Sequence, residues 1–366
     1  MRSPVCAMTS QSASIIPLCQ CFRGLPPKRV DWLSLIELAN RTLTTPALMD
    51  FVDRFPGHVP QDARRYVTEI CRRNVIRNDR LAAQLIEAVA ALNEKGVTPV
   101  LLKGTALLAA KDLAYSQTRL ISDLDLLVPP HQVNAALDCL LALGYRVHFQ
   151  APPGAAKWYA DLQRPEDVGM IDLHQALPGH PFFYRSFGDL QQSCKLTPVG
   201  QGSAYIPSAT CQALMLVIHD QFQDSDYWVG AIDLRHLLDL RNLINSPEGL
   251  DWRMLASLTS SSFVRNALET QLVTLHYLLG VDVPVEMRSR LIARLQYWRR
   301  LLQSRVPLLG HPLLIMGLLD YWSYRAELGR EERITNHLEA SAWVLPKMDT
   351  MRFLFDLTRE HRGGKV

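Results

Sequence analysis

The sequence predicts an α+β fold in which a mixed sheet of four or five strands lies between two helical regions. Short apolar runs bounded by glycine or proline, which are typical of strands, gather in the middle of the chain. Apolar residues spaced three and four apart, which are typical of helices, fill most of the rest. We therefore divide the chain into an N-terminal helical region (1–94), an α/β core (95–206) and a C-terminal helical domain (207–366).

Two helices are expected in the N-terminal region. Asp31 stands directly before a run of apolar residues at helical spacing and fits the N-cap position of the first helix. The second helix is expected over residues 63–93, where apolar side chains form two stripes. Residues 1–28 show no clear periodicity, so we assign no element there.

In the core, short apolar runs alternate with helical stretches. The predicted strands cover residues 97–102, 121–128, 145–150, 169–174 and, as a short fifth strand, 204–206. Helices are expected over residues 105–111 and 133–143, and Gly144 fits the C-cap of the second helix. The pattern does not fix the order of the strands, and parallel and antiparallel pairings are both open.

The last part of the chain is helical almost to its end. Ser208 fits the N-cap of a helix over residues 209–222. Further helices are expected over residues 228–244, 251–259, 263–279, 284–303, 313–327, 330–343 and 348–360. The longest apolar stretch of this half, residues 306–319, is interrupted by a glycine and a proline, so we expect no membrane span.

The composition favours a folded protein over a nucleic-acid-binding module. Hydrophobic residues make up 48% of the 366 residues, whereas charged residues make up 20% and the formal net charge is only +3. The densest basic cluster consists of Arg72, Arg73, Arg77 and Arg80. Its helical spacing indicates a solvated helix face rather than a phosphate-binding surface. Extended nucleic acid is therefore not an expected partner.

The cysteines indicate a reducing compartment. There are seven, an odd number, at irregular spacing. Cys19 and Cys21 stand too close together for an ordinary zinc pair, and no second half of such a site follows. No long apolar stretch follows the first residues, so a secretory signal is not expected. We expect reduced thiols and a cytoplasmic location.

The sharpest chemical signal is Ser122-Asp123-Leu124-Asp125-Leu126-Leu127-Val128. Side chains alternate along a strand, so Asp123 and Asp125 point to the same face. Two carboxylates about 4 Å apart repel by about 4 kcal/mol at an effective dielectric constant of about 20. A divalent cation between them relieves that repulsion, and Mg²⁺ or Mn²⁺ is the expected ion because both prefer oxygen ligands. Alternatively, one or both carboxylates are solvated at the end of the strand.

A second acidic strand supports the metal interpretation. In Met170-Ile171-Asp172-Leu173-His174 the acid lies among apolar neighbours, and His174 shares the face of Asp172. If this strand pairs beside the Asp123 strand, three carboxylates converge, as a two-metal site for phosphoryl transfer requires. His174 would then orient Asp172 or the substrate, unless it is a structural histidine with a hydrogen-bond partner.

Upstream, Lys103-Gly104-Thr105 follows a predicted strand and opens a predicted helix. Such a turn can bind a nucleotide: Gly104 lets the backbone approach a phosphate, Thr105 adds a hydroxyl and Lys103 adds a positive charge. The residue order of a Walker A loop is absent. Arg119, just before the acidic strand, is a candidate for contacting a leaving pyrophosphate or for neutralising Asp123. Lys103 is a candidate for pairing with the same acids.

Together, these motifs resemble the nucleotidyltransferase superfamily that includes DNA polymerase beta, and more closely the bacterial group of uncharacterised nucleotidyltransferases. The resemblance lies in the Lys103-Gly104 turn, the Asp-x-Asp strand and the later Asp-Leu-His strand. It extends more weakly through the flanking helices, over about residues 30–350. It implies a nucleotidyltransferase-like mixed sheet embedded in helices.

The resemblance also implies a role for each matching residue. Asp123 and Asp125 would bind both metal ions. Asp172 would bind the catalytic ion and help to activate the acceptor. Gly104 and Thr105 would cradle the β- and γ-phosphates of the nucleotide.

Secondary candidates lie in the segments that follow. His219 and Asp233 are in helices that also look like that group, although His219 equally fits a core histidine and Asp233 a helix-stabilising pair. Four aromatic residues are candidates for stacking on a base or for ordinary packing: Trp158, Tyr159, Tyr227 and Trp228.

We therefore expect an enzyme that transfers a nucleotide from an NTP to an acceptor and releases pyrophosphate. The acceptor, which the sequence does not identify, would be a small molecule, a peptide or a protein. Two alternatives stay open. One is a transferase that uses another nucleotide-activated donor, moving a phospho-substituent or a sugar. The other is a catalytically inactive nucleotidyltransferase fold that acts as an interaction protein.

Overall fold

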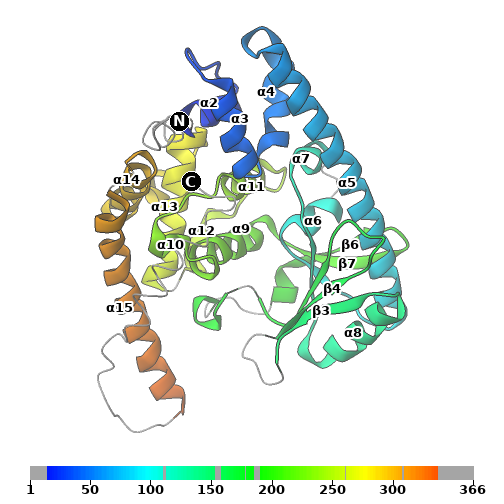
Figure 1. The fold of residues 1–366 in the computed structure, drawn as a ribbon. Helices are drawn as coiled ribbons and strands as arrows, with labels where there is room; N and C mark the ends of the chain where they lie inside the picture. Colours follow the sequence, from blue (N-terminus) through cyan, green and yellow to red (C-terminus); the bar gives the residue numbers. More distant parts are fainter. Residues whose placement is uncertain are drawn as a thin grey trace.

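The computed structural model describes residues 15–109, 113–152, 158–177, 179–184, 190–259, 261–306 and 309–336. These residues form a mixed sheet of seven strands in the order β3-β4-β5-β2-β1-β7-β6, with helices packed around it (Figure 1). The strands are β1 (Val100–Leu101), β2 (Leu124–Leu127), β3 (Arg146–Gln150), β4 (Tyr159–Gln163), β5 (Ile171–His174), β6 (Cys194–Val199) and β7 (Gly202–Pro207). The predicted α+β class is confirmed, but the predicted number of strands, four or five, is too low.

Two strands, β4 and β6, have no counterpart in the sequence prediction. In β4 only Ala160 and Leu162 are buried, and polar residues such as Asp161 stand beside them. β6 is an edge strand and contains Pro198, which has no backbone N–H to donate. Continuous apolar runs, the signal used for the other strands, are absent from both.

The central strands β2 and β5 run parallel, and their neighbours β1 and β4 run antiparallel to them. In this register Leu126 lies opposite Leu173, and both side chains are fully buried on one face of the sheet. Because side chains alternate along a strand, Asp125 and its partner Asp172 lie together on the other face.

The apolar face of the sheet packs on α5 (Gln61–Glu94) and α8 (Val133–Ala142). Leu85 of α5 and Leu140 of α8 are buried in this core. Both helices lie within two residues of their predicted ranges. Gly144 follows α8 with φ of +92°, a left-handed conformation that favours glycine at a helix C-terminus.

A second core lies among helices from both ends of the chain. The N-terminal helices α2 (Ile15–Phe22), α3 (Trp32–Arg41) and α4 (Met49–Arg54) share it with α9 (Ala209–Ile218), α11 (Leu234–Asn245) and α13 (Ser262–Leu279). Figure 1 shows α5 running from these N-terminal helices to the sheet, and its residues enter both cores. The division of the chain at residues 94 and 206 stays a prediction.

The remaining helices are α6 (Lys103–Ala109), α7 (Leu113–Thr118), α10 (Asp226–Val229), α12 (Trp252–Ser257), α14 (Leu291–Arg305) and α15 (Gly310–Asn336). The predicted helix over residues 228–244 is two helices, because Gly230, with φ of +77°, ends α10. α15 joins two predicted helices, and the one predicted over residues 348–360 lies outside the described residues. α2 was not expected from the sequence pattern.

Predicted N-caps and surface features can be checked directly. The side chain of Asp31 accepts from the N–H of Leu33, and that of Ser208 accepts from the N–H of Cys211, so both predicted caps are confirmed.

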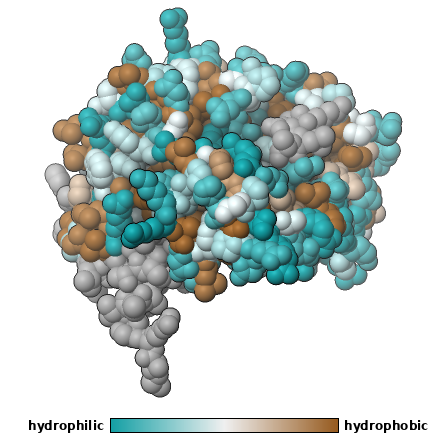
Figure 2. Space-filling view, turned by 90° about the horizontal axis from the view of Figure 1, so that it is seen from above, coloured by the Kyte–Doolittle hydropathy of each residue, from teal (hydrophilic) through white to brown (hydrophobic). Residues whose placement is uncertain are grey.

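No helix in the described ranges is long and apolar enough to cross a bilayer. The thiols of Cys19, Cys21, Cys71, Cys139 and Cys211 are free. The face shown in Figure 2 is largely hydrophilic, with hydrophobic residues scattered in small groups.

Arg77 of α5 ties together the segments that lead into the two acidic strands. Its guanidinium donates to the carbonyl oxygens of Ile121 (3.2 Å), Ser122 (2.8 Å) and Val168 (2.5 Å). The prediction of a solvated helix face is correct for Arg72 and Arg73, which are exposed and pair with Glu69 on the same helix. It is wrong for Arg77, which makes these backbone contacts. Arg77 instead holds the starts of β2 and β5 side by side.

We predict that Arg77→Met lowers the free energy of unfolding by about 2 kcal/mol or more, because it leaves three backbone carbonyls without their charged donor. Urea denaturation of the variant and the wild type would measure the difference. Arg73→Met, which changes the same charge on an exposed turn of the same helix, is the matched control and should have little effect. Equal stability of the two variants would mean that Arg77 does not brace the strands.

Candidate active site

A row of carboxylates crosses the polar face of the sheet. Asp125 on β2 lies opposite Asp172 on β5, and Asp172 lies opposite Asp161 on β4. Asp123 directly precedes β2 and lines the same cavity as these acids. The structure thus brings the three predicted acids together and adds a fourth, Asp161, which the sequence analysis did not single out.

Asp125 is held by two neighbouring side chains and is only 2% exposed. Lys103 Nζ donates to its Oδ1 at 2.8 Å, and His174 Nε2 lies 3.3 Å from the same oxygen. Burial by itself would raise the pKa of Asp125, but the charge of Lys103 and the contact with His174 lower that pKa to about 2. Asp125 is therefore ionised across the ordinary pH range.

Asp172 has the opposite environment. Burial and the neighbouring charges of Asp123, Asp125 and Asp161 raise its pKa to about 8. Its Oδ1 is buried and has no hydrogen-bond partner among the described residues. An acceptor without a donor, placed in a group of mutually repelling carboxylates, is what a cation would satisfy.

The chemistry of the donor set fits a hard divalent cation. Asp125, Asp172 and His174 each offer a possible ligand atom, and these atoms lie within 4.8 Å of one another. Carboxylate oxygens are the preferred ligands of Mg²⁺ and Mn²⁺ in proteins. Lys103 already neutralises part of the charge on Asp125, so an incoming cation would share that carboxylate with the ammonium group.

The Lys103-Gly104-Thr105 turn supports the acidic strand from one side. The hydroxyl of Thr105, which is fully buried, accepts from the N–H of Asp125 at 2.7 Å. Thr105 therefore positions the strand, and its hydroxyl is not directed at a phosphate. A Cβ at Gly104 would lie 3.3 Å from the side chain of Ile121, which would have to shift by a few tenths of an ångström to admit it.

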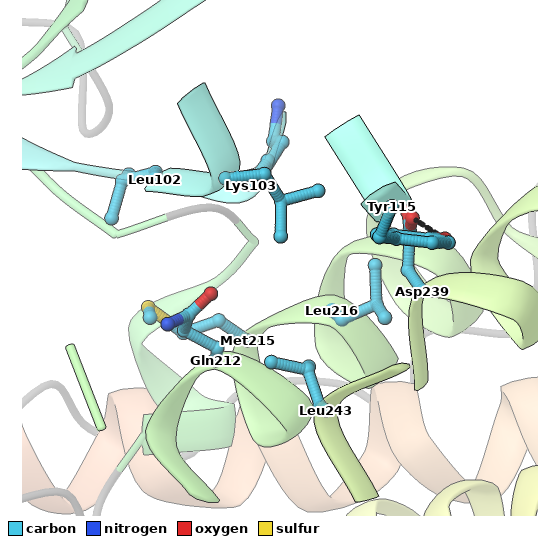
Figure 3. Close-up of a pocket in the computed structure, with 9 residues that line it drawn as sticks. Leu102, Lys103, Tyr115, Gln212, Met215, Leu216, Asp239 and Leu243 are labelled. Carbon is cyan, nitrogen blue, oxygen red and sulfur yellow. Dashed lines mark hydrogen bonds between the residues drawn. The ribbon is translucent and has the colours of Figure 1, made fainter. Parts of the chain in front are cut away.

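Lys103 itself has a strained backbone, with φ of +48°. Such a conformation costs a non-glycine residue about 1–3 kcal/mol and is typical of functional sites. It directs the ammonium group to Asp125, as the sequence analysis allowed. Figure 3 shows this side chain turned away from a small pocket of ≈ 30 Å³, which is formed with Leu102, Met215, Leu216 and other residues.

The ion-pair partner of Arg119 in the structure is Asp239, not Asp123. Its guanidinium binds both carboxylate oxygens of Asp239 on α11, at 2.6 and 2.8 Å. The hydroxyl of Tyr115 donates to the same carboxylate at 2.6 Å, a contact visible in Figure 3. The Arg119–Asp239 ion pair is buried and joins the segment before β2 to the C-terminal helices.

A cavity of ≈ 520 Å³ opens above the carboxylates. On the sheet side, the cavity is lined by the four acids and by Lys103, Gly104, Arg119, His174 and Tyr159. On the helical side, it is lined by Leu216 of α9, by Arg235, His236 and Asp239 of α11, and by His219 and Gln223 of the turn after α9. This volume is within the usual range for sites that bind small molecules and cofactors. The acids, the turn and Arg119 therefore share one cavity.

Several predicted secondary residues can now be placed. His219 lines the cavity, whereas Asp233 is buried beside it as the N-cap of α11, where it accepts from the N–H of His236. Tyr159 lines the cavity and stacks on His174, with ring centroids 6.1 Å apart. Tyr227 and Trp228 belong to the helical core. Trp158 packs against the core beneath the sheet.

A family model described as an uncharacterised nucleotidyltransferase matches residues 28–280 of the 366. The match includes the acidic row and the helices that line the cavity. The resemblance inferred from the motifs is thereby confirmed. No curated protein and no solved structure matches the chain.

The raised pKa of Asp172 gives a prediction for the metal-free protein. The folded state keeps a proton on Asp172 up to about pH 8, whereas the unfolded state loses it near the ordinary value of 3.8. This group's contribution to stability is therefore full below about pH 4 and is lost as the pH rises to about 8. Asp172→Asn should make the protein more stable than wild type at pH 8 in a chelator, with the advantage shrinking towards pH 4.

Thermal denaturation from pH 4 to 8 would test this expectation. Asp138→Asn, at an exposed position of α8, is the control and should follow the wild type. Adding Mg²⁺ should stabilise the wild type more than it stabilises the Asp172 variant. A variant that is less stable than wild type at pH 8 would show that Asp172 is not held in a repulsive environment.

Proposed function

We propose that this chain, which belongs to the uncharacterised nucleotidyltransferase family, transfers a nucleotide from an NTP to an acceptor and releases pyrophosphate. The observation that supports this most directly is the row of carboxylates on one sheet face, open to a cavity large enough for a nucleotide. Transfer of this kind needs little covalent chemistry from the protein, and it needs oriented charges around the phosphates.

The three predicted acids take distinct roles in this proposal. Asp123 and Asp125 hold Mg²⁺ or Mn²⁺ beside the phosphates of the donor. When bound, the ions supply positive charge to the phosphate oxygens and make the acceptor group more acidic. Asp172 would help to hold the catalytic ion and to activate the acceptor, because its buried Oδ1 has no hydrogen-bond donor among the described residues. A nucleophilic group of the acceptor attacks the α-phosphorus, its proton goes to a carboxylate, and the bond to the β-phosphate oxygen breaks.

Other residues bind and orient the donor. Lys103 is partly exposed to the cavity and can contact a phosphate while it stays close to Asp125. Gly104 leaves room beside it. Tyr159 offers the face of an aromatic ring at the same cavity and is our candidate for stacking on the base. Arg119 acts indirectly in this proposal, by holding α11 against the sheet.

The partners that we propose are an NTP as donor and a small molecule, a peptide or a protein as acceptor. The cavity carries both acidic and basic side chains and is no extended basic surface, so extended nucleic acid is not proposed. The free cysteines in the described ranges favour a reducing compartment, and we propose the cytoplasm.

Donor binding is the first test. Thermal unfolding with each NTP, with and without Mg²⁺ or Mn²⁺, should show stabilisation that needs both the nucleotide and the metal ion. A ligand present at 100 times its dissociation constant stabilises the folded state by about 2.7 kcal/mol, so the shift is measurable. Asp123→Asn should lose the shift, whereas the exposed control Asp138→Asn should keep it.

Transfer is the second test, with products identified by mass spectrometry. Asp172→Asn should keep donor binding but lower turnover by roughly 10²- to 10⁴-fold, the usual range for a group that moves a proton. A product with a phospho-substituent or a sugar in place of the nucleotide would identify another activated donor. If no NTP stabilises the protein with any metal ion, the inactive interaction fold becomes the better explanation.

A further inference from the structure

The cavity wall that comes from the C-terminal helices carries positive charge. Arg235 and His236, at the start of α11, line the same cavity as the carboxylates of the sheet. His219 and Gln223 also line it, and they mark the two ends of a π-helical turn, residues His219–Gln223, that follows α9. Such turns are rare and are often found at functional sites.

Two buried carboxylates hold the His236 ring. Its Nδ1 lies 3.0 Å from an oxygen of Asp220 and 3.4 Å from an oxygen of Asp233. Burial by itself would lower the pKa of His236, but the charges of Asp233 and Asp220 raise that pKa above the ordinary value. The two carboxylates therefore favour the protonated ring, and one of its N–H groups is committed to them.

The other ring nitrogen, Nε2, belongs to a side chain that lines the cavity. It makes no hydrogen bond to any described residue, and it is not among the enclosed atoms that lack a partner. Its N–H therefore remains available for a ligand.

Arg235 is an uncommitted cation beside that ring. It is half-buried, lines the cavity and makes no hydrogen bond or ion pair with the described residues. The other arginine of the cavity, Arg119, is already bound through two oxygens to Asp239. Arg235 and His236 thus offer several N–H donors to the cavity, and no carboxylate of the described residues forms an ion pair with Arg235.

Asp220, Asp233 and His236 are also residue types that can bind a metal ion, and their ligand atoms lie within 4.8 Å of one another. Hydrogen bonds already satisfy its members. Asp220 accepts from the amides of Gln221 and Gln271, and Asp233 accepts from the N–H of His236. This arrangement fixes the imidazole ring and leaves no open carboxylate for a cation.

We propose that Arg235 and His236 form an anion-binding subsite that takes a phosphate group of a substrate. The inference rests on the proposed function, which places a substrate with phosphate groups in this cavity. The carboxylate row would repel such a phosphate unless metal ions or these basic side chains held it. The phosphate belongs either to the polyphosphate tail of the donor or to a phosphorylated acceptor. In both cases the ligand lies between the acids of the sheet and the basic side chains of α11.

The subsite can be tested without metal ions. Isothermal titration of the full chain with orthophosphate, pyrophosphate and tripolyphosphate, in a chelator at low ionic strength, should show binding. Arg235→Met should weaken that binding by about tenfold or more, as expected for the loss of a charge-assisted contact. Because Arg235 is half-buried and unpaired, the variant should fold normally. Arg253→Met, at an exposed position of α12, makes the same change outside the cavity and should bind as the wild type does.

Competition identifies the source of the phosphate. If an NTP displaces orthophosphate, the subsite takes the tail of the donor. If orthophosphate still binds while the NTP and a metal ion are bound, the subsite takes a phosphorylated acceptor. Both results support the proposal. Phosphate binding that is absent, or that is equal in the wild type and Arg235→Met, would overturn it.

The two proposals fail separately. Asp123→Asn should lose metal-dependent NTP binding yet keep the binding of phosphate in the chelator. If NTP binding depends on Asp123 while Arg235→Met leaves phosphate binding unchanged, only the proposal of the anion subsite is wrong. If phosphate binding depends on Arg235 while no NTP binds with any metal ion, only the nucleotidyl-transfer proposal is wrong.

Discussion

The register between β2 and β5 is the constraint on which the rest of the site depends. It places Asp125 opposite Asp172 on one face and Leu126 opposite Leu173 on the other. A slip of one residue would turn carboxylates into the core and leucines into the cavity, since side chains alternate with a period of two. Burial of the apolar face on α5 and α8 therefore selects the arrangement of the acids. The fold and the site are specified by the same alternation.

This register brings like charges together, and the surrounding structure holds them there. Arg77 braces the segments before both strands, and Thr105 binds the backbone of Asp125. Gly169 contributes by its size, because a Cβ there would lie 2.8 Å from the carbonyl oxygen of Ser122. These contacts act on the backbone and leave the polar face of the sheet free. The repulsion within the row thus persists in the folded protein, as is common where a site is built to receive a ligand.

The sequence predicted the parts of the site that depend on local periodicity. Asp123 and Asp125 stand two residues apart in an apolar strand, so their common face followed directly. Asp161 escaped notice because β4 is short and half polar, and its place beside Asp172 comes from strand pairing, which a single sequence does not reveal. The partner of Arg119 is 120 residues away along the chain, which also puts it beyond any local pattern. Within the site, the contacts that the sequence did not predict are therefore pairings across the fold.

Those long-range pairings give the cavity its second side. The Arg119–Asp239 ion pair is buried, and a pair of this kind adds little to stability because both charges lose their hydration. Its geometry is specific, however, since two guanidinium nitrogens and the hydroxyl of Tyr115 all meet one carboxylate. Asp239 lies one helical turn after Arg235 on α11, so fixing Asp239 also fixes the basic wall relative to the acids. The ion pair therefore sets the distance between the carboxylate face of the sheet and the helices that complete the cavity.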